Sequence, residues 1–332
     1  MRKFSVLLGI LTFVGLFPAA SHAQNSANTD RLYTRVEQLA RSFPGKVGVF
    51  ARDIESGAEV AYNADEQFPM ASTYKVPILV TVYRQAEAGR FSMDDRVQIT
   101  EADRRRGSGL FMHMRPGLNP TVYDLALLMI TVSDNEATDL LLRKVGAENV
   151  TATMRQLGIK DIRVDRQTKD IIRDWVAGLD PKYAQGSIDE GAEKEIERTI
   201  TREKTEAADR AFTDDPRDHA SPRAMTDLLT KIVKSQAASE ASCHDILEIM
   251  KRQLYTERIP RYLEGVTIAS KTGTIGYTTN DVGILFAGKH HIALTIYTLK
   301  ENSSVTTDEA AERIGRIARV IYDYFEDVNG AN

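Results

Sequence analysis

Ser72 and Lys75 bring a hydroxyl and an amine together at a spacing of three residues, directly ahead of an apolar run. A serine hydroxyl is a poor nucleophile until a base takes its proton, and a lysine can be that base only when its amine is kept neutral. Residues three apart share one face of a helix, so the two groups can meet. A capping serine followed by a solvated lysine is the alternative interpretation, and the pair alone does not decide between them.

Two further motifs favour the chemical interpretation. Ser133-Asp134-Asn135 lies between two helical stretches, and Lys271-Thr272-Gly273 lies at the end of a strand-like run. Together with Ser72 and Lys75 they occur in the order and type known for serine penicillin-interacting enzymes. The joint occurrence of three such motifs by chance is very improbable.

On these motifs the chain resembles the class A β-lactamase family, within the wider superfamily of penicillin-binding proteins. The likeness extends over nearly the whole chain after the first 23 residues, through the segments ASTYKVPIL, GSGLF, LMITVSDNEATDLLL, DDPRDHASPRAM and SKTGT. The resemblance implies that Ser72 attacks the carbonyl carbon of a β-lactam or a D-alanyl peptide and forms an acyl-enzyme. Lys75 would relay the proton, Ser133 would pass it to the departing nitrogen, and Lys271 would lend a positive field.

The resemblance also implies how substrate is held. The backbone amides of Ser72 and Thr274 would form the oxyanion hole, which typically contributes a few kcal/mol of transition-state stabilisation per donor. Asn135 would bind the side-chain amide of the substrate, while the hydroxyls of Thr272 and Thr274 would bind its carboxylate. Gly273 would let the strand approach the substrate closely, which a side chain would obstruct.

The chain departs from the family in one short loop. Class A enzymes carry an aspartate-arginine pair followed, after one residue, by the glutamate that activates water against the acyl-enzyme. In VDRQTKDII, Asp165 and Arg166 match the anchor, but Thr168 stands in the glutamate's place and Ile172 in that of the usual asparagine. Arg166 can still pair with Asp218 of the closing segment DDPRD.

The missing carboxylate leaves deacylation open, because hydrolysis of the ester needs a water held against a general base. The candidates are Asp170, Glu190 and Glu193, with Lys75 itself as a further one. The two glutamates lie in a charged insertion over 173–213, which we expect to form one exposed helix with a thin apolar stripe. The insertion is either a solvated excursion or a lid over the cleft.

The periodicity of the remaining chain predicts the elements that must position these groups. We expect an α/β (α+β) fold of β-lactamase/D,D-peptidase type, with an antiparallel sheet flanked by terminal helices, an all-helical lobe, and the active-site cleft between them. The predicted strands are KVGVFARDIE, AEVAYN, GVTIASKTG, DVGILFAG and HIALTIYTL. The sheet domain would comprise 24–67 and 255–332, and the helical domain 68–254.

The first 23 residues read as a secretory signal, in which Arg2 and Lys3 precede an apolar run and Ser21-His22-Ala23 offers a cleavage site. We therefore expect a periplasmic or secreted protein that is cleaved near Ala23. No apolar stretch after that point is long enough to span a bilayer. The formal charge of −4 for the whole chain gives no reason to expect nucleic acid as a partner.

The remaining composition favours a monomer that carries no cofactor or metal. The single cysteine, Cys243, excludes an internal disulfide and is expected to be a buried thiol. No two of the six histidines have the helical spacing expected of a zinc site.

Three functions remain open. The first is a β-lactamase-type hydrolase, the second is a penicillin-binding D,D-peptidase with slow deacylation, and the third is a non-catalytic penicillin-binding or sensing protein. The three intact motifs argue against the last.

Overall fold

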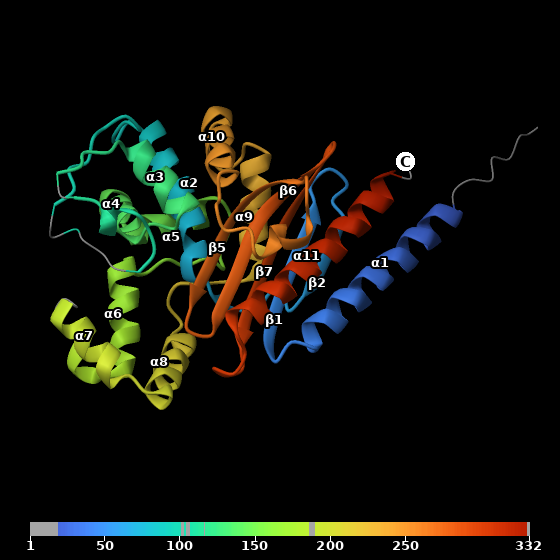
Figure 1. Cartoon of the computed structure of the whole chain (residues 1–332). Coiled ribbons are helices and arrows are strands. Elements are labelled where there is room, and N and C mark those ends of the chain that lie inside the picture. Colours follow the sequence, from blue (N-terminus) through green and yellow to red (C-terminus); the bar gives the residue numbers. More distant parts are fainter. Residues whose placement is uncertain (1–18, 101–102, 104–106, 116, 186–189, 331–332) are drawn as a thin grey trace, which may run out of the picture.

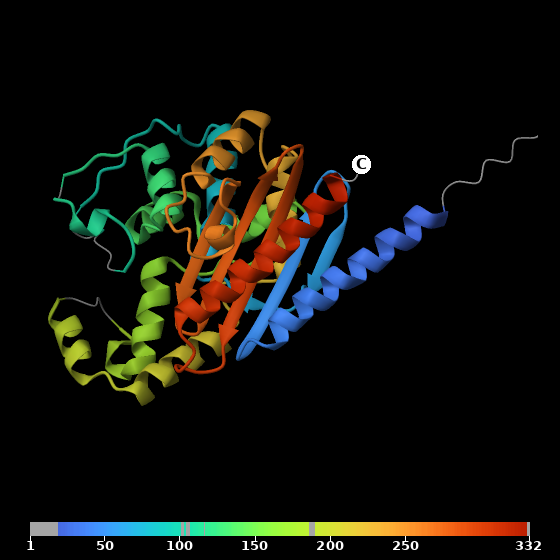
Figure 2. The same ribbon diagram turned by 45° about the vertical axis from the view of Figure 1, so that its right-hand side comes forward.

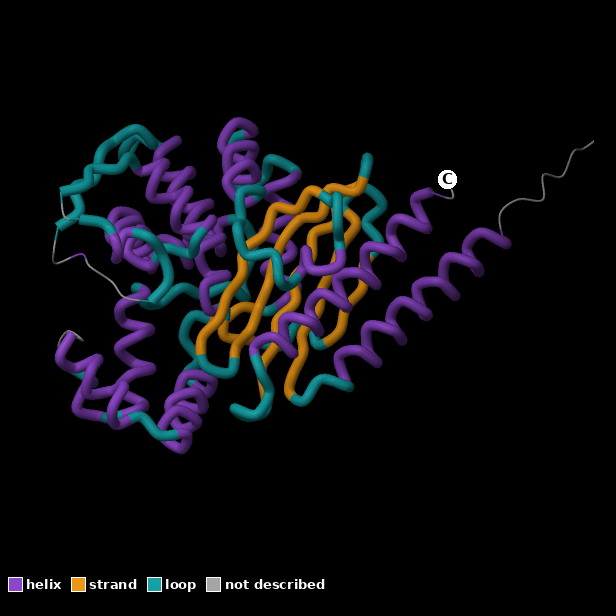
Figure 3. Tube along the Cα trace, viewed as in Figure 1, coloured by secondary structure: helices purple, strands orange, loops and turns teal. Residues whose placement is uncertain are grey.

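The computed structural model describes residues 19–100, 103, 107–115, 117–185 and 190–330. Its centre is a five-stranded antiparallel sheet in the order β2-β1-β7-β6-β5 (Figure 1; strands are orange in Figure 3). The strands are β1 Gly45–Asp53, β2 Glu59–Tyr62, β5 Thr267–Ile275, β6 Thr278–Ala287 and β7 His290–Lys300. The antiparallel sheet predicted from the sequence is therefore confirmed.

Helices cover both faces of this sheet. The terminal helices α1 (Ala19–Arg41) and α11 (Thr307–Gly330) lie side by side across one face (Figure 2). On the other face α9 (Pro222–Val233) packs against β1 and β7. Because both faces are covered, β6 is buried along almost its whole length and β7 is buried in its middle. Ser221 caps α9 by accepting from the Ala224 amide, and Pro222 is its first residue.

The rest of the helical part packs beside the sheet. Its helices are α2 Lys75–Glu87, α3 Val122–Thr131, α4 Asn135–Val145, α5 Ala147–Gln156 and α10 Glu240–Met250. One hydrophobic cluster joins these helices to side chains of the sheet such as Ala269, Val282 and Tyr297. A second cluster fills the space between the sheet and the two terminal helices. The assignment of 24–67, 68–254 and 255–332 to two domains stays a prediction.

The insertion is helical, but the expectation of one helix was wrong. The structure has α6 (Thr168–Leu179), α7 (Glu190–Thr199) and α8 (Arg202–Asp214). Thr201 interrupts the apolar spacing because its hydroxyl accepts a hydrogen bond from the Lys204 amide and so starts a new helix. α8 packs against α6, and a Cβ added at Gly178 would lie 2.8 Å from Ala208 Cα.

Short elements lead into the predicted motifs. The two-residue strand β3 (Phe68–Pro69) lies just before the Ser72 turn and pairs with the two-residue strand β4 (His219–Ala220). The one-turn 3-10 helix η1 (Ala71–Tyr74) then precedes α2. The chain thus enters α2 through a 3-10 turn.

The predicted signal and cleavage site stay predictions. Residues 1–18 lie outside the described part of the chain, and α1 already begins at Ala19, ahead of the predicted cleavage site at Ala23. Within the described residues, no helix combines the length and apolarity that crossing a bilayer requires.

Candidate active site

Ser72 lies half-buried in η1 on a turn with an unusual backbone. Ala71, directly before it, has φ +46°, a region that is rare for residues other than glycine. The Thr73 hydroxyl donates to Met70 O at 2.8 Å, and Asn280 Nδ2 on β6 donates to the same carbonyl at 3.2 Å. The backbone of the turn that carries Ser72 is therefore held from within and from the sheet.

Strand β5 runs against this turn. A Cβ added at Gly273 would lie 2.7 Å from Met70 O and 3.0 Å from the backbone nitrogen of Ser72, closer than real Cβ contacts come. Only a glycine allows this approach. Thr274, whose backbone amide is predicted to form the oxyanion hole with that of Ser72, follows Gly273 directly on this strand.

Lys75 is fully buried, and its ammonium group has three uncharged acceptors. Its Nζ atom donates to Ser133 O at 2.7 Å, Ser133 Oγ at 3.0 Å and Asn135 Oδ1 at 2.9 Å. Burial lowers the pKa of Lys75 to about 7, against the opposing effect of the Asp134 and Asp139 carboxylates. An amine with this pKa is available as a base at neutral pH.

Ser133 links two lysines. Lys271 Nζ donates to Ser133 Oγ at 3.1 Å and to Thr272 O at 2.8 Å. Burial, followed by the charges of Lys75 and Arg258, holds the pKa of Lys271 well below its usual range. Ser133 itself has φ +56°, a strained conformation that aims its hydroxyl between the two amines.

The conformation of the Ser133 turn is set by its neighbours. The Asp134 carboxylate accepts from the backbone amides of Leu110 at 2.7 Å and Phe111 at 2.9 Å. The Ser108 hydroxyl donates to Asn135 Oδ1 at 3.2 Å. These bonds tie the predicted substrate-binding amide of Asn135 to the segment over 107–111.

Sequence reasoning missed Arg258, which lies outside every motif. The buried guanidinium donates through Nη1 to Gly273 O at 2.9 Å and to Asn280 O at 2.6 Å, and through Nη2 to Thr274 Oγ1 at 2.5 Å. It thus places a positive charge behind the hydroxyl predicted to bind the substrate carboxylate. No spacing in the sequence could have given this signal, because the contact depends on how η5 (Ile259–Tyr262) packs against β6.

The loop anchor is a buried ion network. Arg166 Nε donates to Asp218 Oδ2 at 2.6 Å, and its Nη1 donates to Asp174 at 2.9 Å and Asp215 at 3.0 Å. Asp218 Oδ1 also accepts from the backbone amide of Asp165 at 2.7 Å. The two ends of the loop that contains the insertion are therefore joined at this point.

Thr168 opens α6 and meets two groups that the sequence did not point to. Its hydroxyl lies 2.5 Å from the Tyr74 hydroxyl, and both side chains are buried. Its backbone amide donates to Asp139 Oδ1 at 2.6 Å, and the amide of Lys169 donates to Asp139 Oδ2 at 3.1 Å. Asp139, on α4, is thus a buried carboxylate whose two oxygens accept hydrogen bonds from the first backbone amides of α6.

The carboxylates predicted as deacylation bases have other neighbours or lie outside the described residues. Asp170 pairs with Arg173 at 2.8 Å on the partly exposed side of α6. The side chains of Glu190 and Glu193 lie outside the described part of the chain. The neighbouring Glu195 bonds to Lys182 at 2.7 Å.

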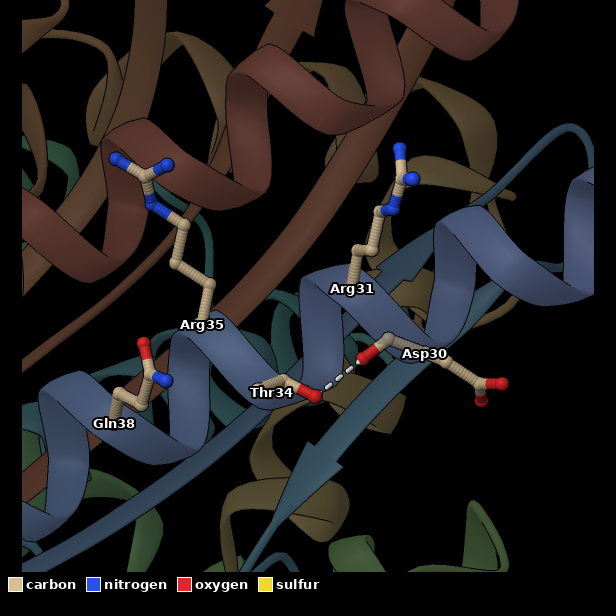
Figure 4. A pocket seen from close by; sticks show the side chains of 5 residues that line it. All are labelled: Asp30, Arg31, Thr34, Arg35 and Gln38. Carbon is tan, nitrogen blue, oxygen red and sulfur yellow. Dashed lines mark hydrogen bonds between the residues drawn. The ribbon is translucent and has the colours of Figure 1, made fainter.

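Two other polar groupings lie apart from these residues. Asp53, Glu55 and His290 could place three ligand atoms within 4.8 Å of one another where β1 ends and β7 begins. Figure 4 shows a hollow lined by side chains of α1 alone, where the Thr34 hydroxyl donates to Asp30 O at 2.8 Å. Its lining contains none of the predicted site residues.

Two β-lactamases are similar to this chain in sequence over most of their length. The chain is 23% identical to β-lactamase PSE-4 from Pseudomonas aeruginosa over 95% of its length and 97% of that protein. It is 27% identical to the carbapenem-hydrolyzing β-lactamase KPC from Klebsiella oxytoca, with 82% of each chain covered.

Solved structures also match this chain over most of its length. A β-lactamase from Sphaerobacter thermophilus matches with a TM-score of 0.68 and 26% identity, covering 89% of this chain and 95% of that one. The structure of PBP-A matches with a TM-score of 0.71 and 23% identity, covering 90% and 96%, which shows a common fold. The model of the β-lactamase enzyme family matches residues 31–325. The chain therefore belongs to the β-lactamase enzyme family.

Proposed function

We propose that this protein is exported to the periplasm and opens β-lactam rings through an acyl-enzyme on Ser72. The observation that carries the proposal is the Ser133 hydroxyl, which lies 3.0 Å from Lys75 Nζ and 3.1 Å from Lys271 Nζ. The close approach of β5 to the Ser72 turn at Gly273 supports the assignment of the oxyanion donors to the backbone amides of Ser72 and Thr274.

The acylation step follows from this arrangement. Neutral Lys75 takes the proton of the Ser72 hydroxyl while Ser72 Oγ forms a bond to the lactam carbonyl carbon. The carbon–nitrogen bond of the ring then breaks, and the nitrogen receives a proton from the Ser133 hydroxyl. Ser133 is reprotonated by Lys75, with which it is hydrogen bonded.

We assign substrate recognition to the end of strand β5, to Arg258 and to Asn135. Arg258 supplies positive charge at the Thr274 hydroxyl, and Lys271 donates to the neighbouring Thr272 O, which suits the carboxylate that β-lactams carry. Asn135, whose amide oxygen faces Lys75, is positioned to bind a substrate amide through its nitrogen.

For deacylation we propose Lys75 as the base. Once the ring nitrogen has left with a proton, Lys75 is again neutral at a pH above about 7 and can take a proton from water. The hydroxyl pair of Thr168 and Tyr74 offers no comparable base, because burial, followed by the charge of Asp139, holds the pKa of Tyr74 well above its usual value.

The same hydroxyl pair favours a second candidate, a penicillin-binding D,D-peptidase whose acyl-enzyme with penicillin is long-lived. Intact-mass measurement after benzylpenicillin treatment, combined with hydrolysis of a chromogenic cephalosporin, separates the candidates. Turnover of the cephalosporin supports the hydrolase, and a durable adduct without turnover supports the peptidase. If neither turnover nor an adduct is observed, both candidates are contradicted.

N-terminal sequencing of the exported protein tests for a start near Gln24.

A further inference from the structure

Position 168, where a class A enzyme would carry its glutamate, is enclosed by Tyr74 and Asp139. Tyr74 is 2% exposed and Asp139 is 1% exposed, so neither can turn out to solvent without leaving the core. Tyr74 lies two residues after the nucleophile, and Asp139 lies on α4, four residues after Asn135. Both are therefore fixed by the same elements that build the site.

We infer that Tyr74 and Asp139 together exclude a working carboxylate base from position 168, so that hydrolysis of the Ser72 acyl-enzyme is left to Lys75. The inference rests on the acyl-enzyme proposed above. It assigns both residues a positioning role, since neither is placed in contact with the reacting atoms.

Tyr74 excludes a carboxylate by occupancy. Its hydroxyl lies 2.5 Å from Thr168 Oγ1, which is already a short hydrogen bond. A glutamate side chain leaves the backbone at the same Cβ and extends two bonds beyond the point that this oxygen now occupies. The extra atoms would meet the buried phenol, because close-packed interiors leave few voids to accept them.

Asp139 excludes a carboxylate by charge. Its two oxygens accept the amides of Thr168 at 2.6 Å and Lys169 at 3.1 Å, so the first amides of α6 are not available to a second acid. Two carboxylates that share a buried site cannot both ionise readily, and the proton is retained on one of them. A glutamate at 168 would then be protonated at neutral pH and would fail as a base.

The two effects predict which substitutions must accompany a glutamate at position 168. Installing a hydrolytic glutamate requires Asp139→Asn, which removes the charge but keeps one oxygen for the Thr168 amide, and Tyr74→Phe, which removes the hydroxyl but keeps the ring. Thr168→Glu alone should give a poor base, and the combination T168E/D139N/Y74F should give a working one.

The experiment compares T168E, T168E/D139N/Y74F and the control T168Q/D139N/Y74F with the wild-type protein. Each is acylated with benzylpenicillin at pH 8, above the Lys75 pKa of about 7, and loss of the adduct is followed by intact-mass spectrometry. We expect the triple variant to lose the adduct at least about tenfold faster than T168E and than the glutamine control, as a positioned base would produce. Y74F and D139N as single variants should keep the wild-type rate at pH 8, because Lys75 is neutral at this pH whether or not Asp139 is charged.

A pH profile separates positioning from a general loosening of the fold. In T168E/Y74F, which keeps Asp139, the apparent pKa of deacylation should lie above that of T168E/D139N/Y74F, because only the former has two adjacent acids. The other charges that act on Tyr74 are Asp218 and Arg166, and Asp134 acts on Lys75. These four charged groups are the same in both variants, which also share the Tyr74 substitution.

Three results would overturn the inference. They are a T168E protein that deacylates as fast as the triple variant, a single Y74F or D139N variant that gains the same rate, and a triple variant less stable to heating than T168E. If T168E unfolds while the triple variant folds, the exclusion is supported directly. Failure of the wild-type protein to form any adduct would instead contradict the proposed function, which keeps the two outcomes distinct.

Discussion

The Nζ atom of Lys75 lies 3.0 Å from the Oγ atom of Ser133, deep in a site whose acceptors for this amine are all uncharged. This single contact joins the α2 helix, which begins directly after the nucleophile's turn, to the turn that must protonate the leaving group. Because the amine is buried among uncharged acceptors, a lysine that would be charged in water can act here as a base.

The acylation rate should rise with pH through about 7, because desolvation lowers the pKa of Lys75 and only the neutral amine can take the Ser72 proton. Asp139→Asn should move this rise to lower pH, since the Asp139 charge favours the ammonium form. Quenched-flow measurement of adduct formation across pH 5–9 checks both. A rise that stays in place or moves to higher pH in D139N contradicts this assignment of the base.

Ser133→Ala should slow acylation by about 10²- to 10⁴-fold, the range typical of a lost proton-transfer group. The fold should be retained, because Lys75 keeps Ser133 O and Asn135 Oδ1 as acceptors. The matched control is Ser108→Ala, which removes a hydroxyl that also bonds to Ser133 O but is not on the proposed proton route. Equal losses in the two variants would remove Ser133 from the route.

Arg258→Ala should raise KM for a carboxylate-bearing cephalosporin by about 10- to 100-fold, as expected for a lost charge-assisted hydrogen bond worth about 1.5–3 kcal/mol. The effect should be small for the methyl ester of the same compound, because the ester carries no charge for Arg258 to attract. If both compounds are affected alike, Arg258 only supports the backbone of Gly273 and Asn280, to which it also donates.

Arg166→Met should lower the free energy of unfolding by about 3–5 kcal/mol, because it leaves the buried Asp218 carboxylate without its partner. Arg163→Met, which breaks the more exposed pair with Asp165, should cost only about 0–1 kcal/mol. Urea unfolding of both variants checks this. Similar losses would show that burial does not distinguish the two pairs.

Asp170→Asn, Glu190→Gln and Glu193→Gln should each leave the rate of adduct loss unchanged, because we assign deacylation to Lys75. For Asp170 the reason is its ion pair with Arg173. Intact-mass time courses measure the rate. A large loss of deacylation in any one of the three would identify that residue as the base and replace Lys75 in this role.

The motifs and the sheet could be predicted from the sequence because each depends on local pattern. Ser72, Lys75 and the strand around Gly273 follow from spacing and alternation. The folded structure keeps these local preferences because its tertiary contacts favour the same conformation.

The Thr168–Tyr74 contact and the positions of Arg258 and Asp139 could not be predicted in this way. Each depends on two elements that meet only after the helices pack on the sheet, and each side chain alone reads as ordinary. Thr201 shows the same limit at a smaller scale. The thin apolar stripe of the insertion predicts one helix, whereas α7 ends at Thr199 and the Thr201 cap starts α8.

Peptide mapping of the benzylpenicillin-treated protein is the sharpest test of Ser72 as the nucleophile. We expect the penicilloyl mass on the peptide that contains Ser72, and we expect it to disappear in Ser72→Ala. An adduct that persists in Ser72→Ala, or that maps to another residue, would show that the nucleophile lies elsewhere.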